Sequence, residues 1–161
     1  MADAAPRSRR SAGILLFRRN DAGVEVLLGH PGGPYFENKD VGAWSIPKGQ
    51  VENGEDLLAV AKREFGEETG HVVGSNARLL ELGSIRQRGG KTVHAWALEG
   101  DMDPAEARSN TFRMEWPPRS GIFIDVPELD QVAWFTPALA RVAMNPAQVA
   151  LIDALLERLD G

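Results

Sequence analysis

With 161 residues, of which 43% are hydrophobic and 25% charged, the chain has the composition of one globular domain large enough to bury a core. Its net charge of −5 argues against broad binding to nucleic acid, which requires a basic surface, so we expect no stable nucleic-acid partner. The absence of cysteine excludes disulfides and thiolate catalysis and is compatible with a cytoplasmic location. No apolar run approaches the roughly 20 residues that span a membrane.

The N-terminal residues MADAAPRSRR contain basic side chains, but the hydrophobic segment after them is too short for a signal peptide. We therefore expect residues 1–10 to form a flexible tail. Residues 11–161 are then expected to form a single domain.

Alternating apolar residues bounded by glycine, proline and asparagine predict the strands. In chain order they are expected at residues 11–18, 24–29, 44–46, 79–87, 92–98, 110–116 and 132–135. Pro47 ends the third of these strands, and a loop marked by glycine and proline precedes it at residues 31–41.

Three helices are predicted. The first covers residues 56–68, with Gly70 as its C-cap and Gly66 as an interior glycine that costs up to about 1 kcal/mol relative to alanine. Thr136 precedes a short second helix, and Asn145 caps the last one. The apolar positions expected to face the core are Leu58, Ala61 and Phe65 in the first helix and Val149, Ile152, Leu156 and Leu159 in the last. This order of elements indicates a mixed sheet with helices on both faces.

The first predicted helix carries acidic residues on one face. A helix turns once per about 3.6 residues, so Glu64, Glu67 and Glu68 project from the same side. Three adjacent carboxylates repel one another unless a cation lies among them, and Mg²⁺ and Mn²⁺ prefer such all-oxygen sites. We therefore interpret this face as a divalent metal site that handles phosphates. Without the residues around it, a solvated charged helix face would be the better interpretation.

Those surrounding residues resemble the Nudix box of the Nudix hydrolases. The matching positions are Gly49, Glu55, Arg63, Glu64, Phe65, Glu67, Glu68 and Gly70. His71 departs from the pattern, because the family usually has an aliphatic residue after the last glycine, and this affects packing more than chemistry. The resemblance covers residues 49–71. It implies an α/β (α+β) fold, the Nudix-like α/β/α sandwich with a mixed sheet, the box as a loop–helix–loop on one side and a C-terminal helix.

The resemblance also implies a reaction and a role for each residue of the box. The expected reaction is the Mg²⁺- or Mn²⁺-dependent hydrolysis of a phosphoanhydride bond by attack of water on phosphorus. The implied metal ligands are Glu64, Glu67, Glu68 and the backbone carbonyl of Gly49. Glu67 is alternatively the base that deprotonates the water. Arg63 and Glu55 are expected to pair and tie the loop to the helix.

Many members of the family take a further metal ligand or base from outside the box. Glu99, Glu106 and Glu115 are the candidates in this chain. We choose Glu115 as a metal ligand, because two prolines stiffen the chain after it and aromatic and basic residues flank it. A solvated surface glutamate is the alternative. The three histidines show no zinc-ligand spacing.

Basic and aromatic residues near the box are candidates for contacts with substrate. Lys48 precedes Gly49 and could reach a phosphate, with a solvated lysine as an equal alternative. Arg86, Arg88 and Lys91 crowd around a glycine turn and form either a phosphate-facing patch or an ordinary hairpin tip. The aromatic residues that could stack on a base are Tyr35, Phe36, Trp44 and Trp116, although tryptophans are commoner in cores.

The substrate stays open at this point. The stretch WSIPKGQVENGED resembles the residues leading into the box of animal-type diadenosine tetraphosphate hydrolases and related nucleotide-cleaning enzymes. The resemblance therefore implies a nucleoside or dinucleoside polyphosphate as the small-molecule partner. An oxidised nucleoside triphosphate and a diphosphoinositol polyphosphate are the competing substrates. Catalytically silent, ligand-sensing Nudix domains also exist, and a homodimer, frequent in the family, is a further open alternative.

Overall fold

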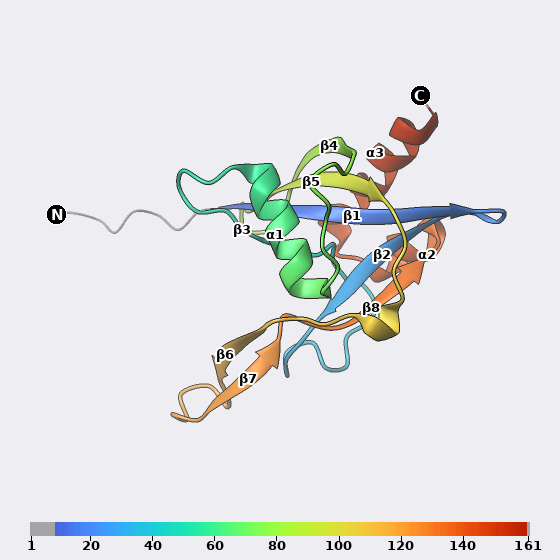
Figure 1. Cartoon of the computed structure of the whole chain (residues 1–161). Helices are drawn as coiled ribbons and strands as arrows, with labels where there is room; N and C mark the ends of the chain where they lie inside the picture. The colour runs from blue at the N-terminus through green and yellow to red at the C-terminus, as the bar shows by residue number, and fades with distance from the viewer. Residues whose placement is uncertain (1–8, 161) are drawn as a thin grey trace.

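The computed structural model describes residues 9–160 (Figure 1). The strands in that range are β1 (Arg10–Asn20), β2 (Gly23–Pro31), β3 (Lys48–Gln50), β4 (Leu79–Arg86), β5 (Thr92–Glu99), β6 (Thr111–Glu115), β7 (Phe123–Pro127) and β8 (Leu129–Phe135). The helices are α1 (Leu57–Thr69), α2 (Pro137–Ala143) and α3 (Val149–Asp160), with 3₁₀ turns at Pro104–Glu106 and Pro146–Gln148. None of the helices in this range is both long and apolar enough to cross a membrane. Of the predicted tail, residues 1–8 lie outside the described range, and Arg10 already begins β1.

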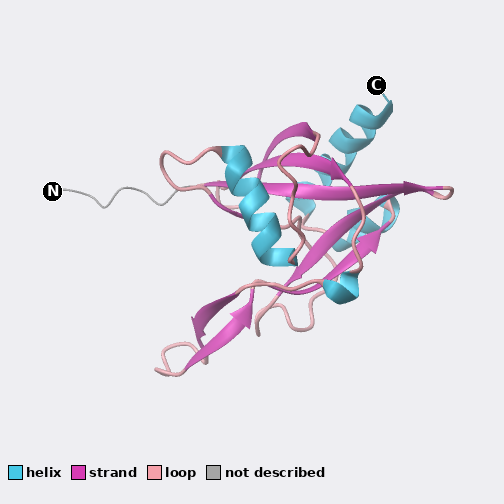
Figure 2. Ribbon diagram, in the orientation of Figure 1, coloured by secondary structure: helices cyan, strands magenta, loops and turns pink. Residues whose placement is uncertain are grey.

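The main sheet is mixed, as the order of elements predicts. Its strands follow the order β4-β5-β1-β2-β8, and β3 pairs with the start of β1 beside this path. β1 and β5 run parallel, and the other pairings in this sheet are antiparallel. β6 and β7 form a separate two-stranded sheet that projects from the body of the protein (Figures 1 and 2).

Helices cover both faces of the main sheet, because successive residues of β1 point to two different cores. Leu15 packs on one face, in the same cluster as Ile152 of α3. Ile14 points to the opposite face, where Phe65 of α1 lies in the same cluster. Each such fully buried side chain stabilises the fold by about 1.5–3 kcal/mol. The predicted sandwich, with the acidic helix on one side and the C-terminal helix on the other, is therefore confirmed (Figure 2).

Helix α1 begins and ends one residue later than the sequence predicts, and Gly70 is its C-cap as expected. Asp56 is its N-cap, and the carboxylate accepts a hydrogen bond from the backbone N–H of Ala59 at 3.0 Å. Gly70 is the C-cap and has a φ of 80°, a left-handed conformation that glycine adopts without steric cost. Val60 is buried, whereas Leu58, predicted to face the core, is only half-buried. The buried face of the helix is thus rotated slightly toward its acidic residues.

Two strands differ from the sequence prediction. In the described structure, residues 44–46 make only isolated bridges to neighbouring segments and no strand. The ladder forms after Pro47, whose carbonyl oxygen accepts a hydrogen bond from Ile14 at 3.2 Å, and it continues as β3. Strand β7 was not predicted, because Val126 is its one fully buried residue and its sequence lacks a clear apolar alternation.

Candidate active site

Strand β3 and helix α1 bring the two ends of the acidic motif together. Gly49 is the central residue of β3, and a Cβ atom at this position would overlap the carboxyl group of Glu64. Any larger residue at this position would force the Glu64 side chain to move away from the strand. The close approach of helix and strand sets the Glu64 side chain beside the residue whose backbone carbonyl is an expected metal ligand.

The carboxyl groups of α1 perturb one another. Glu64 is half-buried, and burial together with a hydrogen bond to Glu67 raises the pKa of Glu64 to about 7. Glu68 is only 6% exposed, and burial followed by the charge of Glu64 raises the pKa of Glu68 to about 8. These side chains therefore resist carrying a full set of negative charges near neutral pH unless a cation compensates them.

A glutamate from outside the motif, Glu128, joins this cluster. It lies between β7 and β8, and its charge contributes to the raised pKa values of both Glu64 and Glu68. Burial raises the pKa of Glu128 itself, and the charge of Glu67 adds to this effect. The structure thus brings together four carboxyl groups from two distant parts of the chain.

Backbone hydrogen bonds hold Glu128 in place. Its N–H donates to the carbonyl oxygen of Asn110 at 2.9 Å, and the N–H of Asn110 in turn donates to the carbonyl oxygen of Glu67 at 2.8 Å. The segment that carries Glu128 is therefore tied to the last turn of α1. Sequence reasoning missed this residue, and the one signal for it was an acidic side chain after Pro127 in a short connection between strands.

Lys48 is the basic residue of the cluster. Its side chain is half-buried, and burial lowers its pKa while the charges of Glu68 and Glu128 oppose that effect. Its backbone N–H also donates a hydrogen bond to the carboxylate of Glu68. Lys48 therefore lies among the carboxylates and is not a freely solvated lysine.

Arg63 and Glu55 make the contact between loop and helix that the sequence predicts. The Nη1 of Arg63 donates to Oε2 of Glu55 at 2.8 Å, and the other carboxylate oxygen accepts from the backbone N–H of Glu52 at 2.8 Å. The hydrogen bond from Arg63 lowers the pKa of Glu55, which stays ionised. The Nε of Arg63 also lies 4.0 Å from Oε1 of Glu67. Arg63 thus orients groups on both sides of the motif.

A pocket of about 300 Å³ opens beside the carboxylates, and Glu68, Glu128 and Lys48 all line it. Its other lining residues include Phe36, Ser45, Gln87, Leu129 and Asn145. This volume is at the lower end of the range for small-molecule sites. The acidic cluster is therefore accessible to a small ligand.

The donor set suits a hard divalent cation. The cluster offers carboxylate oxygens and a backbone carbonyl, which Mg²⁺ and Mn²⁺ prefer, whereas Zn²⁺ favours nitrogen and sulfur. Within residues 9–160 no three acidic or histidine side chains already converge as a finished ligand set. The carboxyl groups would therefore have to turn toward a common ion. Burial and then repulsion between these groups raise the pKa values of Glu64 and Glu68, and such an ion would offset both effects.

Glu115, which the sequence favoured as the outside carboxylate, lies elsewhere. It ends β6 on the projecting β6–β7 sheet (Figure 1). Its two carboxylate oxygens accept hydrogen bonds from the backbone N–H groups of Arg119 and Gly121, at 3.1 and 3.0 Å. This corrects the sequence-based choice: the prolines and aromatic residues near Glu115 mark a turn that its side chain closes, and Glu128 takes its place in the cluster.

The other predicted substrate contacts are only partly gathered around the pocket. Lys91 is exposed on the β4–β5 hairpin but close enough to Lys48 to lower its pKa, so this hairpin flanks the cluster. Arg86 and Arg88 are exposed on the same hairpin. Tyr35 is 50% exposed and packs edge-on against Trp116, with ring centroids 5.2 Å apart. Trp44, by contrast, is a core residue.

The fold and the site together define an α/β/α domain whose acidic helix faces a small-molecule pocket. The NUDIX domain family matches residues 7–155, and the chain belongs to that family. The match extends well beyond residues 49–71 and confirms the resemblance that those residues carry.

Three proteins that are similar to this chain illustrate the match. The 8-oxo-(d)GTP phosphatase of Mycolicibacterium smegmatis (strain ATCC 700084 / mc(2)155) is 34% identical over 107 residues, which are 59% of this chain but only 31% of that protein. The structure of a C. elegans Ap4A hydrolase binary complex matches with a TM-score of 0.66 and 20% identity, covering 94% of this chain and 98% of that one. The NUDIX domain of Shewanella oneidensis NrtR, complexed with ADP ribose, matches with a TM-score of 0.64 and 18% identity, covering 97% and 90%. At such identities the two structures establish the fold alone.

Proposed function

We propose that this protein catalyses the Mg²⁺- or Mn²⁺-dependent hydrolysis of a phosphoanhydride bond in a nucleoside or dinucleoside polyphosphate. The observation that carries the proposal is the meeting of Glu64, Glu67, Glu68 and Glu128 with Lys48 beside a small-molecule pocket. Membership of the NUDIX family supports the same reaction class. The names of two similar proteins, an Ap4A hydrolase and an 8-oxo-(d)GTP phosphatase, support nucleotides as the substrate class. The lack of cysteine fits a cytoplasmic protein.

In this proposal Glu64, Glu68 and the carbonyl of Gly49 hold the divalent ion. A bound ion of this kind neutralises charge on the phosphates and lowers the pKa of water. Burial of Glu68 strengthens its electrostatic hold, because charges attract more strongly where water is excluded. Glu67 is exposed and hydrogen-bonded to Glu64, and it acts as a further ligand or accepts a proton from the attacking water.

Residues around the acidic face orient the reaction. Lys48 directs a positive charge at a phosphate oxygen from its place beside Glu68 and Glu128. Glu128 adds a carboxylate from outside α1, in the connection between β7 and β8. Arg63 holds Glu55 and with it the loop before α1, so its role is to position the site.

The test is a hydrolysis assay with Mg²⁺ or Mn²⁺ on diadenosine polyphosphates, canonical and oxidised nucleoside triphosphates, ADP-ribose and inositol pyrophosphates. At least one nucleotide should be hydrolysed, and only with metal. Glu68→Gln should lower kcat/KM by at least about 100-fold while the circular dichroism spectrum stays unchanged. Reaction in isotopically labelled water would identify the phosphorus that is attacked. The proposal fails if no nucleotide is hydrolysed, or if Glu67→Gln and Glu68→Gln both turn over like the parent protein.

An oxidised nucleoside triphosphate is the second candidate substrate. The observation that favours it is the 34% identity to an 8-oxo-(d)GTP phosphatase over 59% of this chain. In the same assay, a kcat/KM for the oxidised triphosphate well above that for its unoxidised parent would select this candidate. Tight nucleotide binding without any turnover would instead identify a ligand-sensing domain.

A further inference from the structure

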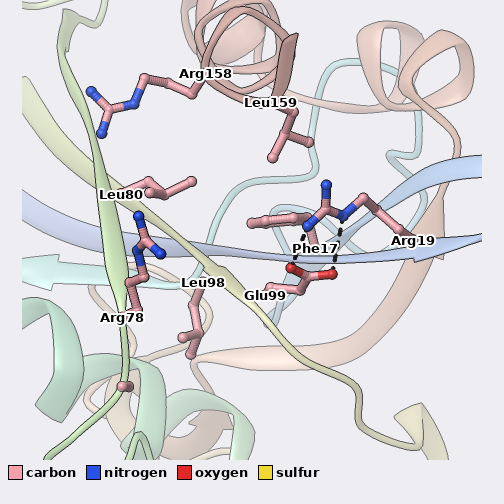
Figure 3. Close-up of a pocket in the computed structure, with 9 residues that line it drawn as sticks. Phe17, Arg19, Arg78, Leu80, Leu98, Glu99, Arg158 and Leu159 are labelled. Carbon is pink, nitrogen blue, oxygen red and sulfur yellow. Dashed lines mark hydrogen bonds and ion pairs between the residues drawn. The ribbon is translucent and has the colours of Figure 1, made fainter. Parts of the chain in front are cut away.

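A second pocket lies toward the other end of β1, away from the acidic cluster. Its volume is about 470 Å³, and residues of β1, β4, β5 and α3 line it (Figure 3). Gly13 pairs with Lys48 of the acidic cluster, and the pocket residue Arg19 lies six positions further along the same strand. At about 3.3 Å per residue, Gly13 and Arg19 are roughly 20 Å apart along the strand, and the two pockets share no lining residue. The second pocket is therefore a separate site.

Apolar side chains form one part of this pocket. Phe17 is buried beneath it, and Leu80 and Leu159, which pack in the same cluster, are half-buried at its walls. Leu80 comes from β4 and Leu159 from α3, so the sheet and the helix face each other across the cavity (Figure 3). Such a surface favours an apolar body over a fully hydrated ion.

Two exposed arginine side chains form the other part. Figure 3 shows the guanidinium groups of Arg78 and Arg158 on the same side of the pocket, with Leu80 between them. Within residues 9–160 neither of these side chains makes an ion pair, a hydrogen bond or a ring contact. Arg19, at the other side of the pocket, is neutralised by Glu99 through hydrogen bonds of 3.1 and 2.7 Å. Among the residues that the structure describes, the pocket therefore keeps two uncompensated positive charges in a chain whose net charge is −5.

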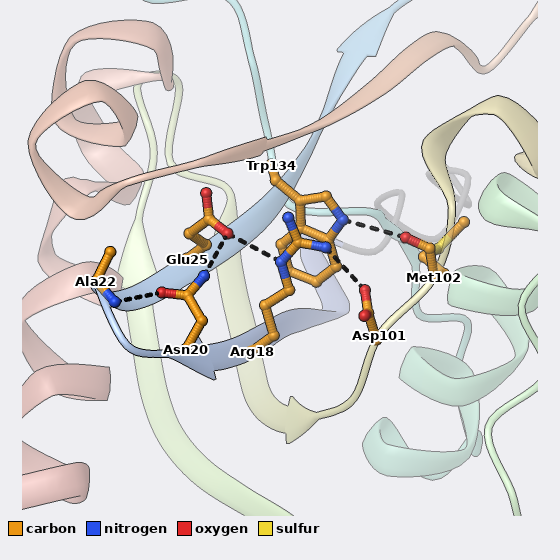
Figure 4. A network of polar contacts seen from close by, with 7 residues as sticks. All are labelled: Arg18, Asn20, Ala22, Glu25, Asp101, Met102 and Trp134. Carbon is orange, nitrogen blue, oxygen red and sulfur yellow. Dashed lines mark hydrogen bonds and ion pairs between the residues drawn. The ribbon is translucent and has the colours of Figure 1, made fainter.

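A nearby arginine shows the contrasting arrangement. Arg18 donates hydrogen bonds to Glu25 and Asp101, each at 2.9 Å, and stacks over the ring of Trp134 at 4.1 Å (Figure 4). Its guanidinium is committed to contacts within the fold. Arg78 and Arg158 have no such commitment, so their donors are available to a ligand.

We propose that this pocket binds a small amphipathic anion. Its phosphate or carboxylate head contacts the guanidinium groups on the side of the pocket that Arg78 and Arg158 share, because guanidinium groups bind both heads through paired N–H donors. Its apolar body lies against Leu80 and Leu159. A phosphomonoester on a planar body and a carboxylate on an aliphatic chain share this chemistry. The inference does not depend on the hydrolase activity proposed above.

Methyl NMR of the full chain tests the proposal in buffer containing EDTA, so that metal-dependent binding and turnover do not interfere. The probes are AMP and octanoate, which represent the two sources of an amphipathic anion. Inorganic phosphate and adenosine serve as head-only and body-only controls. The methyl signals of Leu80 and Leu159 report on this pocket, and those of Leu129 report on the pocket beside the acidic cluster.

At least one probe should shift the reporters of the second pocket saturably and more tightly than either control compound. Arg78→Ala and Arg158→Ala should each weaken that binding by about tenfold to 100-fold, since each removes a charge-assisted contact. Arg113→Ala, which removes an exposed arginine on β6, should leave it unchanged. The probe that binds identifies the source of the anion.

Three results would overturn the proposal. The first is that AMP and octanoate fail to shift the methyl signals of the second pocket at millimolar concentration, or shift only those of Leu129. Binding is the same in the Arg78 and Arg158 variants as in the parent protein. Inorganic phosphate binds as tightly as AMP and octanoate, which would remove the role of the apolar surface.

Discussion

Gly49 and Glu64 lie so close together that the carboxyl group of Glu64 fills the space a Cβ atom at position 49 would need. The contact sets β3 against the acidic face of α1. It also joins fold and site, because the same contact packs the helix on the sheet and brings two expected metal donors together.

Replacing Gly49 by alanine should damage both stability and activity. The added methyl group displaces the carboxyl group of Glu64, so kcat/KM should fall, and the free energy of unfolding should fall by up to about 1 kcal/mol because this half-buried side chain can rotate away. Denaturant unfolding and kcat/KM measure the two effects. Gly74→Ala is the matched control, since an added Cβ there meets no atom within 4 Å, and it should stay within about 0.5 kcal/mol of the parent. Equal kcat/KM in the two variants would show that the close approach is not needed.

Replacing Gly66 by alanine should have the opposite effect. Gly66 lies inside α1, and the nearest atom to an added Cβ is the carbonyl oxygen of His71 at 3.9 Å, an ordinary contact distance. The substitution should therefore stabilise the protein by about 0.5–1 kcal/mol, since alanine loses less backbone entropy in a helix. A rise in Tm of roughly 1–4 °C checks this. A fall in Tm would mean that Gly66 allows another part of the chain to come close in a conformation that differs from this one.

The two candidate carboxylates outside the motif should respond differently to amide substitution. Glu128→Gln removes a charge that acts on Glu64 and Glu68, and it should lower kcat/KM by about 10- to 100-fold. Glu115→Gln should change kcat/KM by less than about twofold, because this carboxylate closes a turn on another sheet. Steady-state kinetics on the best nucleotide of the panel measure both. A larger loss for Glu115→Gln would restore the sequence-based choice.

Stability without metal should fall as the pH rises. Glu64 and Glu68 have pKa values of about 7 and about 8 in the folded chain, against an ordinary value of 4.5. Between these values the folded state binds more protons than the unfolded state, so raising the pH favours unfolding. In EDTA, Tm should drop by roughly 5–10 °C between about pH 5.5 and pH 8.5.

Two comparisons isolate the cause of that drop. In Glu68→Gln the pH dependence should be smaller, since its amide does not ionise. Adding Mg²⁺ at the higher pH should restore much of the lost Tm by binding the folded state. If Tm does not change with pH, or if neither Glu68→Gln nor Mg²⁺ alters the change, the carboxyl groups of the cluster do not destabilise the folded protein at high pH.

Local patterns account for most of the elements. The C-cap of α1 at Gly70 and the β4–β5 hairpin lie where the sequence predicts, because each depends on neighbouring residues. The strand predicted at residues 44–46 failed for a different reason. Its pairing partners are distant in sequence, and the ladder forms only after Pro47.

The sequence by itself determined the acidic helix face and its C-cap, because periodicity and spacing within one helix are local properties. The motif at residues 49–71 also pointed to the family by resemblance. Only the tertiary structure decided that Glu128, and not Glu115, stands beside Glu68. That choice follows from backbone hydrogen bonds between the β7–β8 connection, Asn110 and the end of α1, which no local pattern records. The pocket between Arg78 and Arg158 has the same origin, since it exists only where β4 and α3 meet.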